Sequence, residues 1–177
     1  MIHKKGSRSG SLAYEDAVLE ALCFGWIDSK ANSLDDERYK LWMAPRKPLS
    51  MWSASNKRRV ESLLAAGLIT EAGLATIDAA KADGSWNALD RSEALEVPDD
   101  LVEAFERHAG SRANWDGFPP SARKQILWWV YSAKREETRA TRVEQTASLA
   151  ARNERANQPK PTTTDQPAAP PKRSSKT

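Results

Sequence analysis

Two groups of side chains in this sequence have types and spacings that could bind a partner. The first is a basic segment, residues 134–142, in which Arg139 and Arg142 are three residues apart and share one face of a predicted helix. Guanidinium groups suit phosphate oxygens, so this face could contact an anionic partner or a nucleic acid. Glu136 and Glu137 interrupt the run, which favours the alternative of a solvated face with internal ion pairs. The candidate binding residues of this group are Lys134, Thr138, Arg139 and Arg142.

The second group consists of Trp52, Ser53 and Asn56, at the start of another predicted helix. Asn56 opens a short basic run that ends at Arg59, so this face could also meet an anion. A structural interpretation stands beside the binding one. Ser53 is a plausible helix N-cap, and a tryptophan at an element boundary usually buries its ring while the indole N–H reaches a carbonyl.

No arrangement of residues typical of an enzyme appears in the sequence. The two histidines, His3 and His108, have no second histidine, cysteine or carboxylate at a spacing that recurs in metal sites. No serine occupies the strand-turn-helix setting of a nucleophile that His108 could activate, and the common glycine-rich phosphate loops are missing. The sequence therefore predicts no catalytic residues, no metal site and no cofactor.

The candidate residues must be positioned by a fold that we predict to be mainly α (α+β). Residues 14–24 have apolar side chains at helical spacing and end at Gly25. Residues 26–31 and 39–43 show the pattern of a short antiparallel β-hairpin, separated by a polar stretch. The hairpin is the only sheet structure that the sequence predicts.

A proline-bounded loop follows the hairpin. Pro45 and Pro48 end any strand, so we expect an exposed loop that carries Arg46 and Lys47. This loop leads into the helix that Ser53 would cap.

Two helices with matching start and stop signals come next. Ser53 and Thr70 are their predicted N-caps, and Gly67 and Gly84 follow their last turns. Because few residues join the helices, we expect them to form a helical hairpin and to pack against each other. The residues predicted to face inward are Val60, Leu63, Leu64, Leu74 and Ile77.

Prolines introduce the remaining helices. Pro98 and the two aspartates after it suit a helix first turn. A break at residues 119–120 precedes a helix that Ser121 could cap, and one more helix follows it. The predicted buried residues of that last helix are Val143, Ala147 and Ala150.

The sequence predicts one folded domain with two flexible ends. Residues 13–155 have the length and apolar content of a single domain. Residues 1–12 are expected to be a flexible N-terminus. Residues 156–177 are rich in Pro, Thr, Ala, Lys and Ser without apolar periodicity, which is typical of a disordered basic tail.

Charge is distributed in blocks although the net charge is only +3. Residues 1–60 carry 11 basic and 7 acidic side chains, residues 61–118 carry 4 and 12, and residues 119–177 carry 12 and 5. Such blocks are consistent with contact to a polyanion or with packing of the ends against an acidic middle. The single cysteine, Cys23, lies among apolar residues, and no signal peptide or membrane-spanning run is apparent. We therefore expect a cytoplasmic protein.

A series of short motifs in fixed order resembles one known family. The motifs are Phe24-Gly25-Trp26, Pro45-Arg46-Lys47-Pro48, Trp52-Ser53 with Asn56, Ile69-Thr70 with Gly73, Gly84 with Trp86, Val97-Pro98, and Lys134 with Thr138-Arg139. In order and spacing, roughly from Lys4 to Arg152, the sequence resembles the YdeI/OmpD-associated "bacteriocin-protection" family. No single motif is diagnostic, and the resemblance depends on their number.

The resemblance implies a small bacterial protein linked by name to bacteriocin tolerance or envelope stress, with no established reaction and no catalytic residues to transfer. Family members typically have a tryptophan-containing helix and an apolar strand before the Lys4-Lys5-Gly6 motif. We therefore expect either an assigned start that is too late or a hairpin edge that lacks its covering strand.

Three functional hypotheses follow. The first is a non-enzymatic stress or bacteriocin-protection protein that acts through a binding surface on an unknown protein or anionic partner. The second is a nucleic-acid-associated protein that uses the basic C-terminal helices and tail. The third is a small-molecule enzyme with no recognisable site.

Overall fold

The structure is a computed structural model that describes residues 2–3 and 12–158. The chain divides into two compact units, Met1–Val97 (unit 1) and Pro98–Thr177 (unit 2). The prediction of a single domain over residues 13–155 differs from this division. The physical reason is that the main hydrophobic cluster of unit 1 draws its buried members from Val18 to Ala80, while unit 2 buries its own apolar side chains.

Unit 1 begins with a small antiparallel sheet in the order β1-β3-β2. The predicted hairpin is confirmed as β2 (Trp26–Ser33) and β3 (Arg38–Pro45). β1 (Ile2–His3) pairs with the Arg38–Tyr39 end of β3. Ile2 is buried, so this part of the predicted flexible N-terminus belongs to the sheet. The rest of that prediction, residues 1 and 4–11, lies outside the described residues.

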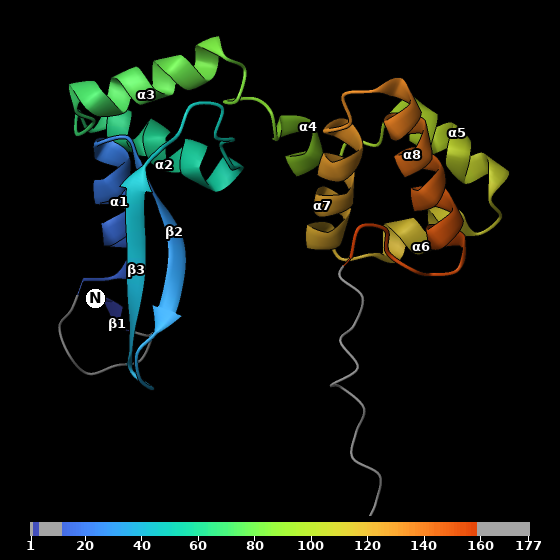
Figure 1. The fold of residues 1–177 in the computed structure, drawn as a ribbon, viewed down its shortest axis with the longest axis horizontal. Coiled ribbons are helices and arrows are strands. Elements are labelled where there is room, and N and C mark those ends of the chain that lie inside the picture. Colours follow the sequence, from blue (N-terminus) through green and yellow to red (C-terminus); the bar gives the residue numbers. More distant parts are fainter. Residues whose placement is uncertain (1, 4–11, 159–177) are drawn as a thin grey trace, which may run out of the picture. The chain divides into compact units, whose positions relative to one another are not determined.

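Helix α1 (Tyr14–Cys23) lies along the hairpin and also packs against α2 (Ala54–Ala65) and α3 (Glu71–Ala82) (Figure 1). Both predicted caps are confirmed, because the Ser53 and Thr70 hydroxyl oxygens accept the N–H groups of Asn56 and Gly73, each at 3.3 Å. A short helix, α4 (Asp90–Glu93), was not predicted.

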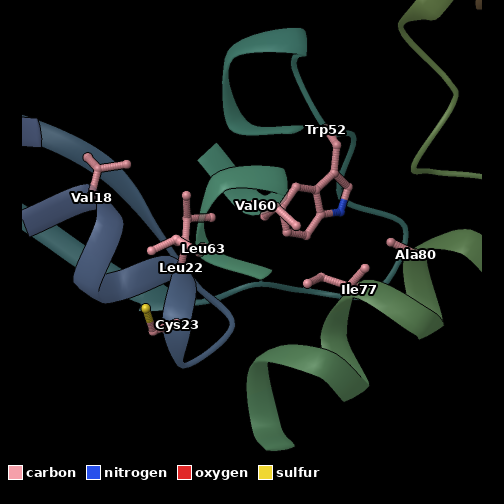
Figure 2. Close-up of a cluster of buried hydrophobic side chains, with 8 residues drawn as sticks. All are labelled: Val18, Leu22, Cys23, Trp52, Val60, Leu63, Ile77 and Ala80. Carbon is pink, nitrogen blue, oxygen red and sulfur yellow. The ribbon is translucent and has the colours of Figure 1, made fainter. Parts of the chain in front are cut away.

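The core of unit 1 gathers side chains from all three long helices and from the loop before α2 (Figure 2). The expectation that Leu64 and Leu74 face inward is wrong, since they are 43% and 40% exposed. The reason is that α2 and α3 both turn their apolar sides toward α1 and the Trp52 ring, so only one stripe of each helix is covered. The buried cluster is Val18, Leu22, Cys23, Trp52, Val60, Leu63, Ile77 and Ala80.

The end of α1 and the start of α3 make a close contact. The carbonyl oxygen of Cys23 accepts both the N–H of Thr70 at 3.0 Å and its hydroxyl at 2.7 Å. A Cβ atom at Gly73 would lie 2.3 Å from the same oxygen, so only glycine allows this approach. Gly25 then turns the chain into β2 with a φ of +73°.

Unit 2 is helical throughout its described residues. α8 (Glu136–Ala151) packs against α5 (Asp99–Arg107), α6 (Ser111–Gly117) and α7 (Pro120–Tyr131). The buried core residues include Leu101, Phe105, Trp115, Ile126, Leu127, Val130, Val143, Ala147 and Ala150.

The boundaries of unit 2 differ from the predictions at two places. Pro119, not Ser121, is the N-cap of α7, and Pro120 occupies the first helical position, where its missing N–H costs nothing. The predicted tail begins too early, because Ala156 is only 1% exposed. The remainder of that tail, residues 159–177, lies outside the described residues. Within the described chain no helix is long and apolar enough to cross a membrane.

Candidate binding site

Trp52 lies beneath the side chain of Arg46 in unit 1. β3 ends at Pro45, and the Arg46 N–H donates to the carbonyl of Gly25 at 3.0 Å, which fixes the start of the next loop. The guanidinium carbon then lies 3.8 Å from the centre of the Trp52 ring. Arg46 is 8% exposed and Trp52 1% exposed. The predicted exposed loop is confirmed at residues 47–49, but Arg46 itself is buried, because the indole draws the guanidinium inward by a cation–π contact.

The Arg46 guanidinium uses only one of its edges. Its Nη1 atom donates to the carbonyls of Ser50 and Met51 at 3.3 and 2.9 Å. Its Nε and Nη2 atoms are buried and have no acceptor among the described residues. The same is true of the Nε1 atom of Trp52. Burial lowers the pKa of Arg46 to about 10, against an opposing effect of the Asp28 charge. The group therefore still carries its charge at neutral pH.

A cleft of about 270 Å³ lies between this loop and α3. One side carries Leu49, whose φ of +62° turns its N–H toward Asp83 Oδ2 at 3.1 Å. The other oxygen of Asp83 accepts the Ser85 N–H at 2.8 Å. Hydrogen bonds from Ser85 and Leu49 lower the pKa of Asp83. The cleft is lined by Arg46, Lys47, Pro48, Leu49, Ser50, Trp52, Ala75, Thr76, Ala79, Ala80, Asp83 and Ser85.

A second tryptophan extends the aromatic surface behind the cleft. The rings of Trp52 and Trp86 are 4.9 Å apart at a tilt of 46°. The ammonium groups of Lys57 and Lys81 lie 5.3 and 5.5 Å from the Trp86 ring. Lys57 also pairs with Asp90. This arrangement concentrates positive charge near the indoles, although part of it is neutralised locally.

Ser53 and Asn56 have structural roles. Ser53 caps α2, and the Asn56 side-chain oxygen accepts a bond from Arg59 Nη1 at 2.8 Å. Arg59 in turn donates from Nε and Nη2 to the two oxygens of Glu15, both at 2.7 Å. Of the three residues predicted at this helix start, only Trp52 lines the cleft.

The basic candidate residues lie in unit 2 and are engaged within it. Arg139 donates from Nε and Nη2 to the carboxylate of Asp100 at 2.6 and 3.0 Å. Arg142 donates to the carbonyl of Trp129 and, at 3.1 Å, to the hydroxyl of Ser132, at the end of α7. The pair of Arg139 with Asp100, in the acidic middle of the chain, agrees with the predicted ion-paired face. Both arginines are only half-buried, and each also joins α8 to another helix of its unit.

The other two members of the basic group have no such role. Lys134 is exposed and Thr138 is half-buried. The recess beside Arg139 is lined by Asp100, Glu103, Arg107, Glu136, Arg139, Ala140 and Val143. Three carboxylates against two guanidinium groups make this recess a poor match for phosphates.

The described residues contain no group of three or more His, Cys, Asp or Glu side chains that could hold a metal ion. His108 contacts Glu144 through Nε2, and Arg107 donates to the other oxygen of that carboxylate at 3.2 Å. Hydrogen bonds from His108 and then Arg107 lower the pKa of Glu144. The histidine is therefore a hydrogen-bond partner of the Glu144 carboxylate.

Residues 94–153 match the model of a family described as Bacteriocin-protection, YdeI or OmpD-Associated. This segment is therefore similar to the YdeI/OmpD-associated family over about a third of the chain. Residues 1–76 match a different model, described as Domain of unknown function (DUF8412). The predicted resemblance, which spans Lys4 to Arg152, is therefore confirmed over residues 94–153. No curated protein and no solved structure matches the chain.

The candidate residues fall in different parts of these matches. Arg139 and Arg142 lie in the segment that matches the YdeI/OmpD-associated family, whereas Trp52 lies in the segment that matches the model of unknown function. Sequence reasoning missed Arg46 as a cleft residue because a loop between prolines usually predicts exposure. The available signal was the tryptophan six residues further on, which offers a ring for a guanidinium to cover.

Proposed function

We propose that this protein is a non-enzymatic bacterial protein of stress tolerance or bacteriocin protection that acts in the cytoplasm through a binding surface. The YdeI/OmpD-associated match over residues 94–153 supports the link to bacteriocin protection, because the family description contains that term. A binding role then requires a surface that a partner would cover.

The observation that carries the proposal is an apolar groove of about 470 Å³ on unit 1. Three large apolar side chains stand around it with substantial exposure, Leu12 at 54%, Phe24 at 48% and Trp26 at 41%. Exposed apolar side chains that gather around one concavity are typical of binding surfaces. The groove is lined by Leu12, Ala17, Glu20, Ala21, Phe24, Trp26 and Met43.

The charge of the groove favours one kind of partner. Glu20 is the charged residue in its lining, and Asp16 and Glu20 also line the adjoining recess with Phe24. Apolar walls beside a carboxylate fit a protein segment that presents a bulky apolar side chain next to a lysine or arginine. We take such a segment of a partner protein as the occupant.

Survival of bacteria under bacteriocin exposure tests the proposal. Cells that lack the gene are complemented with the wild type, with Trp26→Ser or with Trp42→Ser. Trp42 is the matched control, because it is 58% exposed in the same hairpin but does not line the groove. We expect Trp26→Ser to behave like the empty vector and Trp42→Ser like the wild type. Equal protection by both variants would contradict the role of the groove.

Charge reversal provides a second comparison. Glu20→Lys should abolish protection, because the groove would repel the basic residue of its partner. Glu61→Lys changes the net charge equally at an exposed position of α2 outside the groove, and it should keep protection. Loss of protection by both variants would point to net charge instead of the groove.

The non-enzymatic part of the proposal is tested with a metabolite screen by thermal shift. A ligand present at 100 times its dissociation constant adds about 2.7 kcal/mol of stability, which is readily detected. Turnover of a stabilising compound by the purified protein would contradict the proposal.

A further inference from the structure

Arg46 differs from Arg59 and Arg139 in what the Nε and Nη2 edge of its guanidinium group binds. Arg59 and Arg139 each hold a carboxylate between Nε and Nη2, with both distances at 2.7 Å to Glu15 and at 2.6 and 3.0 Å to Asp100. In Arg46 the same edge has no acceptor among the described residues. A buried charge with unpaired N–H groups is costly, so an acceptor supplied from outside would be favourable.

The neighbouring carboxylates do not supply that acceptor. Both oxygens of Asp83 accept backbone N–H groups, from Leu49 and Ser85. Asp28 Oδ2 accepts the Tyr14 hydroxyl at 2.8 Å. Neither of these two carboxylates pairs with the Nε and Nη2 edge of Arg46.

We infer that the cleft beside Arg46 binds a small carboxylate with a short apolar body, through the Nε and Nη2 edge of the guanidinium. This edge matches the geometry of a carboxylate, which accepts two parallel N–H bonds. The apolar body would lie against the side chains of Leu49, Ala75 and Ala79. Lys47 and Arg46 outweigh the single acid of the lining, Asp83, so the cleft favours an anion.

Access to the edge requires a local shift because both nitrogens are buried, and we assign this shift to the loop that carries Leu49. The two nitrogens are buried as the loop stands, while Leu49 itself is 69% exposed. Its backbone N–H is tied to α3 through the one bond to Asp83. A loop with so little buried apolar contact opens at low cost.

The carboxylate could belong to a free metabolite or to the C-terminus of a peptide. Calorimetric titration of the full chain distinguishes them, with butyrate as the first probe and N-acetylalanine as the second. Butyramide and N-acetylalanine amide are the matched neutral compounds. We expect both acids, or one of them, to bind and neither amide to do so. Binding of N-acetylalanine alone would assign the site to peptide C-termini.

Three variants test the role of the guanidinium edge. Arg46→Lys keeps the charge but loses the two-bond edge, and it should weaken carboxylate binding by about tenfold or more. Arg58→Lys is the matched control at an exposed position of α2 and should bind as the wild type does. Asp83→Asn removes the negative charge of the lining, and its single amide oxygen accepts one of the two N–H groups that Asp83 binds, from Leu49 and Ser85. This variant should bind carboxylates about threefold more tightly.

Several results would overturn the inference. The first is equal binding of acids and amides, and the second is unchanged carboxylate binding by Arg46→Lys. The third is no heat of binding from either acid up to about 50 mM, a concentration that corresponds to negligible affinity. Tighter binding of inorganic phosphate than of either acid would also overturn the carboxylate assignment. If Arg46→Lys fails to fold, the Asp83→Asn comparison decides, and weaker or equal binding by that variant contradicts the site. The groove assigned above shares no lining residue with this cleft, so the two proposals fail independently.

Discussion

Arg139 holds the carboxylate of Asp100 through two parallel hydrogen bonds, and this ion pair joins α8 to α5 within unit 2. The side chains are 29% and 41% exposed, so solvent weakens the attraction without removing the geometric constraint. The arginine that the sequence offers for phosphate binding therefore has a partner inside its own domain.

Replacement of Arg139 and Arg142 by alanine should destabilise unit 2. The double variant loses the Asp100 pair and the bonds that Arg142 donates at the end of α7, and we expect a loss of about 1 to 3 kcal/mol. Urea unfolding followed by circular dichroism measures this loss. Arg135→Ala is the control, because Arg135 is exposed. Wild-type stability of the double variant would contradict the structural role.

The same double variant tests the nucleic-acid hypothesis. Because both guanidinium groups have internal partners, we expect little binding of a fluorescent duplex or single strand at low salt and no change of salt slope in the variant. If the arginines contacted phosphates, the slope of log affinity against log salt would flatten by about two units. If the wild type binds nucleic acid with an affinity that depends steeply on salt, and the variant does not, the nucleic-acid hypothesis would be restored.

Trp52→Ala should be among the most destabilising single substitutions in unit 1. The ring is fully buried in the core, contacts Trp86 and supports Arg46, so we expect a cost of about 3 to 5 kcal/mol. Chemical denaturation compares this variant with Trp42→Ala, whose wild-type side chain is 58% exposed. A similar small loss for both variants would show that Trp52 is not a core anchor.

Glu144 should make a small pH-dependent contribution to the stability of unit 2. Its pKa is lowered in the folded state by bonds from His108 and Arg107, so its stabilising effect is present above the ordinary pKa near 4.5. The effect is lost as the pH falls through the lowered folded-state pKa. The side chain is 51% exposed, so we expect less than about 1 kcal/mol. The free energies of unfolding of the wild type and of Glu144→Gln should differ at pH 7 and become equal at about pH 2.

Features decided by neighbouring residues could be predicted from the sequence. The caps at Ser53 and Thr70 depend on a hydroxyl three residues before a free N–H, which is a local relationship. The alternation of Tyr39, Leu41 and Met43 likewise indicated the half-buried face of β3.

Features decided by distant residues could not be predicted in this way. The exposure of Leu64 and Leu74 depends on where α1 lies, and the role of Arg139 depends on a carboxylate 39 residues away. The burial of Arg46 depends on a ring that only the folded loop brings beneath it. No local pattern encodes these contacts, which is why the surroundings of the candidate binding residues could not be predicted.

Cys23 gives unit 1 an internal reporter of its own opening. It is the single thiol of the chain, it lies in the core cluster, and burial raises its pKa. Both effects suppress the thiolate, which is the form that alkylating reagents and oxidants attack. The rate of thiol labelling in the native protein therefore measures how often the core of unit 1 exposes this residue, with no added probe.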